Sequence, residues 1–424
     1  MHQHFAYICY YTFPKMANMQ GNDFLESVFK GLESKKPSFR QLVESRKKEL
    51  KIASDLELSK MVNIPNNTLR RLIDGETEKT DLFSILRVCH LLGISEVDMI
   101  QNYAASLPPK DIGELETVGK ANFILKNFNL PLLRKMKFIK STTNFKEIDE
   151  KITKFFGLKS IYLYTQDILP PVLFTKIKRY SNDEMTMLWQ MGAYAQFDKF
   201  ENPNEYDKEA FLSLVPKIRS YTQYEETGLL IVIRALYRIG VTVIVQQYLS
   251  TTSIRGASFI VNKKPCIVIT DIGKAYSTLW FTLLHEICHI LWDYEELKSW
   301  GIHCTGEGTV LSNDLFNENR ANEFAQERLL PKNLLDFISP MIKSPATVND
   351  FALKNKVHAG IIYSLYCYNE KIKNNKDYYA QYQHLFGKSD IAVSMIRLSL
   401  LDEKKESVYE GLEHLKYIYE FTEK

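Results

Sequence analysis

Residues 279–292 read LWFTLLHEICHILW, and His285-Glu286-Ile287-Cys288-His289 within this stretch form an H-E-x-x-H pattern. The run is apolar and contains no proline, which predicts a buried helix. Residues four positions apart lie on one face of a helix, so His285 and His289 can share one metal ion. Unpaired polar groups are costly in a protein core, so the two histidines and Glu286 need a partner there. The pattern therefore predicts a buried metal site.

Zinc is the metal that this pattern favours, and catalytic zinc sites use three protein ligands and a water. Bound zinc makes a water reactive at neutral pH, and Glu286 is placed to act as the general base. The third ligand must come from elsewhere in the chain. The acidic candidates downstream are Asp293, Glu295, Glu296, Glu307, Asp314, Glu318, Glu323 and Glu327.

Among these candidates, residues 293–296 follow the histidines too closely to fold back onto them. Glu318 instead opens a second stretch, 318–331, that has an apolar stripe at helical spacing. The stripe consists of Ala321, Phe324, Ala325 and Leu329. Glu318 adjoins this stripe and is the predicted third ligand. The alternative is that Glu318 only stabilises the positive end of the helix dipole.

The H-E-x-x-H pattern, the E-x-x-A-N-x-F-A pattern at 318–325 and Leu329-Leu330-Pro331 together resemble the ImmA/IrrE family of bacterial zinc metallopeptidases. Segments at 169–174, 188–189, 240–241, 255–257, 264–269, 351–352 and 357–362 extend the resemblance over roughly residues 165–370. It implies a mixed zincin-like domain in which Glu318 is the third ligand. It also implies a protein substrate, such as a transcriptional repressor or an antitoxin.

Residues 257–261 and 266–270 predict two strands joined by a turn at 262–265. A substrate peptide could add to the edge of this hairpin, although the hairpin could equally be scaffold. His303, His358 and Arg320 are candidates for stabilising an oxyanion. The alternative for both histidines is the more common structural role.

Residues 39–105 form a separate unit of five short predicted helices, at 39–52, 55–62, 66–74, 81–92 and 95–105. Residues 58–75 combine a helix, a turn at 63–65 and a second helix closed by Gly75, which is typical of a helix-turn-helix. This segment resembles the XRE family of DNA-binding domains. The resemblance implies duplex DNA as a partner. The alternative is a docking or dimerisation module.

In that resemblance the second helix of the motif reads bases. The predicted DNA-binding residues are Asn66, Asn67, Thr68, Arg70 and Arg71, whose donors suit base edges and phosphates. The first helix adds a predicted phosphate-facing set of Arg46, Lys47, Lys48 and Lys51. Asp55 opposes this assignment, because a carboxylate at the DNA surface would repel phosphate.

Composition sets further bounds. The chain has 424 residues, 45% of them hydrophobic, and a net charge of +3, so charge alone demands no anionic partner. No apolar run approaches the ~18 residues of a membrane span, and residues 1–15 lack the features of a secretion signal. The six cysteines, Cys9, Cys89, Cys266, Cys288, Cys304 and Cys367, show no pairing rhythm, which favours free thiols in the cytoplasm.

The expected fold is α+β, with an all-α N-terminal bundle, a metallopeptidase domain that contains a small sheet, and C-terminal helices. The expected divisions are an extension at 1–38, the helix-turn-helix at 39–105, a connecting segment at 106–165 with a linker at 106–110, the peptidase domain at 166–370 and a helical segment at 371–424. Within these we expect a helix at 145–156, a strand at 161–164 and helices at 391–401 and 408–421.

These features predict a cytoplasmic zinc metallopeptidase and transcriptional regulator that cleaves a repressor or antitoxin in a stress, mobile-element or defence response. A homodimer is one assembly that they allow. The alternative is a DNA-binding regulator whose zinc domain is a sensor or scaffold. Glu286 favours the enzyme, because a purely structural site needs no general base.

Overall fold

The computed structural model describes residues 37–76, 81–95, 98–99, 102, 109–165, 183–249, 251–306 and 316–421. Most of the extension expected at 1–38, the linker residues 106–108, the family-like segment 169–174 and the candidate ligands Glu307 and Asp314 lie outside these residues. The chain divides into two compact units, Met1–Lys126 and Asn127–Lys424. This division differs from the expected one, which placed boundaries at 105, 165 and 370.

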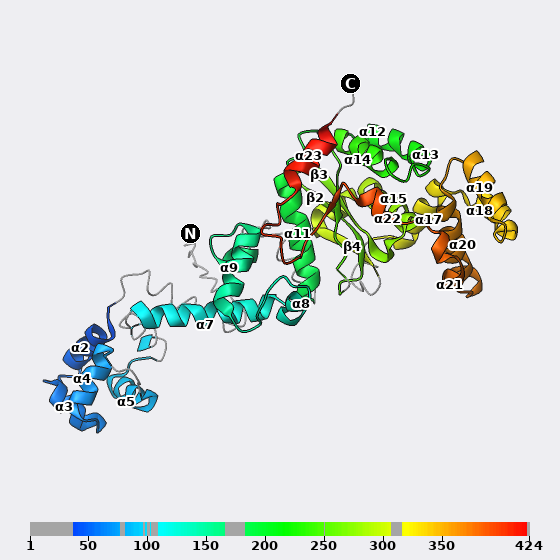
Figure 1. Ribbon diagram of the computed structural model, residues 1–424. Coiled ribbons are helices and arrows are strands. Elements are labelled where there is room, and N and C mark those ends of the chain that lie inside the picture. Colours follow the sequence, from blue (N-terminus) through cyan, green and yellow to red (C-terminus); the bar gives the residue numbers. More distant parts are fainter. Residues whose placement is uncertain are drawn as a thin grey trace, which may run out of the picture. The chain divides into compact units, whose positions relative to one another are not determined.

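The N-terminal unit contains α2 (Phe39–Glu49), α3 (Asp55–Val62), α4 (Asn66–Asp74) and α5 (Leu82–Leu92), shown in blue in Figure 1. These bounds confirm four of the five predicted helices to within three residues, and the fifth, expected at 95–105, lies mostly outside the described residues. Asn63 ends α3 and Gly75 ends α4, both in the left-handed conformation that these two residue types tolerate best. The apolar positions of the four helices meet in one core, which includes Phe39, Val43, Leu58, Leu69, Leu72, Ile85 and Val88.

The larger unit is built on a mixed five-stranded sheet in the order β4-β2-β3-β1-β5. The strands are β1 (Thr242–Gln246), β2 (Ile254–Val261), β3 (Lys264–Thr270), β4 (Ile302–Gly306) and β5 (Arg397–Leu398). β2 pairs antiparallel with β3 and β4, whereas β1 pairs parallel with β3 and β5. Parallel strands are usually covered on both faces, and β1 is buried along its whole length.

The predicted hairpin is confirmed as β2 and β3. Asn262 and Lys263 form its turn, with φ values of 50° and 67°. Two successive positive φ angles match the twist of a two-residue hairpin. The idea that a peptide adds to the edge of this hairpin is wrong, because β2 already pairs with β4 and β3 already pairs with β1. Among the described residues, the strand at that side of the sheet is β4.

Helix α15 (Tyr276–Trp292) carries the H-E-x-x-H motif and contacts both β2 and β3, while α11 (Glu184–Phe200) and α14 (Gly228–Arg238) contact β1. Helix α17 (Glu318–Leu329) packs along α15 (Figure 1). Of the predicted stripe, Ala321, Ala325 and Leu329 are buried. This pairing of α15 with α17 brings the two predicted metal-binding segments together.

The larger unit contains eleven further described α-helices. They are α8 (Leu130–Lys135), α9 (Phe145–Phe156), α12 (Lys208–Leu214), α13 (Ile218–Tyr221), α16 (Tyr294–Trp300), α18 (Lys332–Ile338), α19 (Pro345–Lys354), α20 (Ala359–Asn374), α21 (Tyr379–Tyr382), α22 (Ser389–Val393) and α23 (Leu412–Glu420); α7 (Pro109–Asn127) runs across the boundary between the units. No helix among the described residues is both long and apolar enough to cross a bilayer.

Two predicted elements are wrong. The expected strand at 161–164 is the 3-10 helix η1 (Ile161–Thr165), and Ile161 and Tyr164 are both buried in it. The expected helix at 391–401 is instead the short α22 followed by β5, which joins the sheet beside β1. Alternating apolar residues favour a strand. Whether such a segment becomes a strand or a helical turn depends on the elements that pack against it. The segment 371–424 is therefore part of the larger unit.

Candidate functional site

The two histidines of α15 and the first residue of α17 converge. The Nε2 atoms of His285 and His289 lie 3.1 Å apart. Glu318 places Oε2 3.2 Å from Nε2 of His285 and Oε1 3.6 Å from Nε2 of His289. One ligand atom from each of these three residues lies within 4.8 Å of the others. Ligand atoms bound to one zinc at about 2 Å lie roughly 3–3.5 Å apart, so the set fits a single zinc ion.

In His285 and His289, the hydrogen-bond partner of Nδ1 indicates which ring nitrogen carries the hydrogen. Nδ1 of His285 lies 3.0 Å from Oδ1 of Asn322, and Nδ1 of His289 lies 2.8 Å from Oδ2 of Asp293. Each Nδ1 therefore donates its hydrogen, and in the neutral rings both Nε2 lone pairs face each other and the Glu318 carboxylate. Lone pairs and a carboxylate that meet in a buried space repel unless a cation lies between them.

The pKa values of the three metal-binding side chains are shifted by their burial and by their contacts with one another. Burial opposes the charged form of His285, but the adjacent Glu318 and the other nearby carboxylates raise its pKa. Burial lowers the pKa of His289. Burial also works against ionisation of Glu318, yet the adjacent imidazoles of His285 and His303 hold the pKa of that carboxyl well below its usual range. Glu318 is thus an anion at neutral pH, as a metal ligand must be.

His303 on β4 is the second residue that contacts Glu318. Its Nε2–H donates to Oε1 of Glu318 at 2.8 Å, and its ring stacks on Phe316 with centroids 4.1 Å apart. His303 is only 1% exposed. Nδ1 of His303 has no hydrogen-bond partner among the described residues, so Nε2 makes the contact that orients the ring. His303 therefore holds Glu318 in place.

Glu286 lies on the sheet side of α15 and is completely buried. Its two carboxylate oxygens accept hydrogen bonds of 2.6 Å from the hydroxyl groups of Ser258 on β2 and Thr305 on β4. Gly256 permits this position, because a Cβ atom there would lie 2.6 Å from Oε1 of Glu286. The buried carboxyl group thus has a hydroxyl donor for each of its oxygens.

A pocket of about 190 Å³ opens onto the metal-binding side chains. It is lined by Arg255, Phe281, Thr282, His285, Thr305, Gly306, Glu318 and Asn322. Glu286 is not among the lining residues. Thr305, which donates a hydrogen bond to Glu286, does line the pocket. A substrate group in this pocket would contact His285 and Glu318 directly.

The expected oxyanion candidates take other positions. Arg320 pairs with Asp293, with Nη2 2.5 Å from Oδ1 of that carboxylate, and so supports the partner of His289. His358 caps α20 and lies 2.8 Å from Oε1 of Glu225. Neither these two residues nor His303 lines the pocket. Of the other candidate ligands, Glu323 and Glu327 are exposed on α17, and neither belongs to the metal-binding group.

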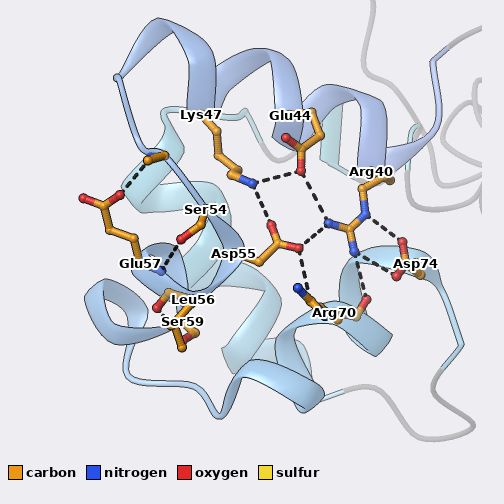
Figure 2. A network of polar contacts seen from close by, with 11 residues as sticks. Arg40, Glu44, Lys47, Ser54, Asp55, Leu56, Glu57, Ser59, Arg70 and Asp74 are labelled. Atoms are coloured by element: carbon orange, nitrogen blue, oxygen red, sulfur yellow. Dashed lines mark hydrogen bonds and ion pairs between the residues drawn. The ribbon is translucent and has the colours of Figure 1, made fainter.

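In the N-terminal unit, the expectation for Asp55 and Lys47 is wrong. Figure 2 shows Asp55 enclosed between α2 and α4, with Lys47 Nζ 2.6 Å and Arg40 Nη1 2.9 Å from its oxygens. The side chains of Asp55 and Lys47 are only 12% and 6% exposed. Asp55 is thus neutralised inside the fold and does not repel phosphate at the surface, while Lys47 is not available for phosphate.

The polar residues of α4, the predicted recognition helix, lie at the protein surface. Asn67, Thr68, Arg70 and Arg71 are exposed, and Asn66 is half-buried. Pro65 precedes α4 and provides no side-chain cap, which leaves the first N–H groups of the helix available to a phosphate. Arg70 also lies 3.6 Å from Asp55, so its charge is shared with the network in Figure 2. Lys48 and Lys51 are exposed on the same unit.

Sequence reasoning missed Ser258 and Thr305 at the metal centre and Arg255 in the pocket, and it considered Asp293 only as a metal ligand. Asp293 has a readable signal, because it follows His289 by four positions on the same helix. Ser258 and Thr305 have none, because their position depends on the pairing of β2 with β4 across more than forty residues of chain.

No model of a known protein family, no curated protein and no solved structure matches this chain.

Proposed function

We propose that the chain is a zinc-dependent metallopeptidase of the ImmA/IrrE type that is joined to a DNA-binding helix-turn-helix unit. The observation that carries this proposal is the convergence of His285, His289 and Glu318, with Glu286 between the two histidines on the same helix. Two imidazoles and one carboxylate leave a fourth position open, which is the donor set of catalytic rather than structural zinc sites.

Zinc in this position would supply a Lewis acid and a water that is nucleophilic at neutral pH. The protein groups do the rest. Asn322 and Asp293 fix the orientation of the two imidazoles, and His303 fixes Glu318. Glu286 would take a proton from the attacking water and return it to the leaving amine, for which its carboxylate must give up a hydrogen bond to Ser258 or Thr305.

The substrate class that we propose is a repressor or antitoxin protein, and the helix-turn-helix unit would bring the peptidase to DNA that carries such a repressor. The exposed polar end of α4 supports the DNA part of this proposal. The resemblance of residues 165–370 to ImmA/IrrE peptidases supports the substrate class.

A second candidate is a DNA-binding regulator in which the zinc site is a sensor or scaffold. One observation favours it: Glu286 is fully buried and both of its oxygens are held by hydroxyl groups. A carboxylate that stays in this position stabilises the fold and takes no proton from substrate water.

Cleavage distinguishes the two candidates. The zinc-loaded full-length chain and its Glu286→Gln variant are incubated with an extract of the source organism, and new protein termini are identified by mass spectrometry. The amide keeps the shape of Glu286 but cannot accept the proton, so we expect cleavage by the native chain only. Glu296→Gln, at an exposed position of α16, is the matched control and should cleave normally. Equal cleavage by the Glu286→Gln variant contradicts the mechanism, and no cleavage by either chain favours the sensor or scaffold.

A further inference from the structure

A β-bulge in strand β2 lies at the pocket. Ile254 pairs with Gly306 and Gly256 pairs with Thr305, so Arg255 is an extra residue without a counterpart on β4. The bulge is held from the other side, because Thr270 Oγ1 on β3 donates to the carbonyl oxygens of Ile254 at 2.9 Å and Arg255 at 3.1 Å. Bulges redirect side chains and are common next to active sites.

The redirected side chain of Arg255 lines the pocket that contains His285 and Glu318. Among the described residues that line this pocket, Arg255 is the only lysine or arginine. A guanidinium group at this pocket favours an anionic ligand over a cationic one.

An aromatic wall adjoins Arg255. The rings of Phe281 and Tyr368 lie 5.8 Å apart, and Phe281 lines the pocket. Burial raises the pKa of Tyr379 to about 12, and the positive charge of Arg255 acts in the opposite direction on this hydroxyl and on that of Tyr368. Arg255 is therefore close to two tyrosines that keep their hydroxyl hydrogens at neutral pH and can donate them.

The exposure of Arg255 distinguishes between two uses of its charge. Stabilising an oxyanion demands a donor in a dry, preorganised position. Arg255 is exposed, which suits recognition of a charged group that arrives with the substrate. The planar guanidinium can hold a carboxylate through two parallel hydrogen bonds.

We infer that Arg255 is a specificity-determining residue that binds an acidic side chain of the substrate next to the scissile bond. This inference rests on the proposed peptidase function and names a feature of its substrate. The bulge sets the position of the guanidinium, and the aromatic wall borders the space that the acidic residue occupies.

The first test measures substrate preference. The zinc-loaded native chain, Arg255→Gln and Arg255→Glu are each incubated with a proteome-derived peptide library, and the residues around every cut are counted. We expect Asp and Glu to be enriched on one side of the native cut, the enrichment to vanish in Arg255→Gln, and Lys and Arg to replace it in Arg255→Glu. Arg238→Gln, at an exposed arginine of α14 outside the pocket, should keep the native preference.

The second test does not depend on cleavage. Binding of succinic acid monohydroxamate and of its uncharged amide analogue to the zinc-loaded Glu286→Gln chain is measured by calorimetry. A charge-assisted contact is expected to make the carboxylate probe bind about ten-fold more tightly. That advantage should disappear when Arg255→Gln is added and persist when Arg238→Gln is added.

The outcomes separate this inference from the proposed function. If the native chain cleaves no peptide but prefers the carboxylate probe through Arg255, the peptidase proposal fails and the anion site stands. If the native chain cleaves peptides without acidic preference and binds both probes equally, the inference is overturned while the peptidase stands. An equal loss of kcat on acidic and neutral peptides in Arg255→Gln also overturns it, because that pattern belongs to an oxyanion-stabilising group.

Discussion

His303 donates a hydrogen bond of 2.8 Å to Glu318, and this contact links the edge strand β4 to the first residue of α17. Groups that orient a metal ligand in this way commonly change metal affinity by about 10–100-fold when they are removed. We therefore expect His303→Ala to weaken zinc binding by about this factor without unfolding the chain, as measured by competition with a chromophoric chelator.

His303→Gln retains a side-chain N–H donor and should recover part of the affinity. His384→Ala, at an exposed histidine of the same unit, is the matched control and should bind zinc like the native chain. Native affinity in the His303→Ala variant would show that Glu318 is positioned by its own helix alone.

Local sequence patterns predicted most of the helices and the hairpin. The apolar run around His285, the turn at Asn262-Lys263 and the stripe on α17 each depend on neighbours a few residues away, and their elements formed as expected. The pairing of β2 with β4 depends on residues far apart in the chain. For this reason the positions of Ser258, Thr305 and His303 around the metal centre could not be predicted from spacing.

Asp55 illustrates the same limit in the N-terminal unit. From sequence alone, a carboxylate near a predicted DNA surface is an unfavourable charge. In the fold, Arg40 and Lys47 from α2 surround Asp55, and both approach it only because α2 packs against α3 and α4 (Figure 2). The effect of a charged residue on binding therefore cannot be predicted while its ion-pair partners in the fold are unknown.

The buried position of Asp55 changes what its substitution does. Asp55→Asn removes the carboxylate from Lys47, whose side chain is 6% exposed, and leaves a buried ammonium group with Glu44 alone. We expect a loss of about 1–3 kcal/mol in the stability of the N-terminal unit. Amide hydrogen exchange of peptides from residues 39–75 in the full-length chain measures this loss.

Glu49→Gln is the control for this substitution. Its partner Arg46 lies 2.7 Å away, but both side chains are largely exposed, so the loss should stay below about 1 kcal/mol. Equal effects of the two substitutions would mean that the Asp55 network contributes no more than a surface ion pair.

The pKa of the Asp55 carboxyl group makes the stability of the N-terminal unit depend on pH. Burial works to raise the pKa of Asp55, but Lys47 and Arg40 lower it below its usual 3.8. A lowered pKa in the folded state stabilises the unit above the unfolded pKa, and this stabilisation is lost as pH falls through the folded pKa. The protection of residues 39–75, corrected for intrinsic exchange, should fall below pH 3.8 more steeply in the native chain than in Asp55→Asn. Parallel decreases in both chains would rule out Asp55 as the responsible group.

DNA binding by α4 is tested with two kinds of variant. Arg70→Ala with Arg71→Ala removes two cations from the exposed face, so binding to every duplex should weaken and the salt dependence should flatten by roughly two ion equivalents. Asn67→Ala should instead change the preference among sequences selected from a random duplex library. Arg87→Ala on α5, an arginine that packs on Phe83, is the control. If the native chain enriches no sequence at physiological salt, the unit is a docking module.

Zinc content tests the central claim most directly. The full-length native chain, loaded with zinc and freed of excess metal, should contain one zinc per chain by elemental analysis. His285→Ala with His289→Ala should contain none, and Glu318→Ala should lose most of its zinc. Glu323→Ala, at an exposed glutamate of the same helix, should keep one zinc. Unchanged zinc in the double histidine variant, or zinc that is lost with Glu323 and retained without Glu318, would contradict the site.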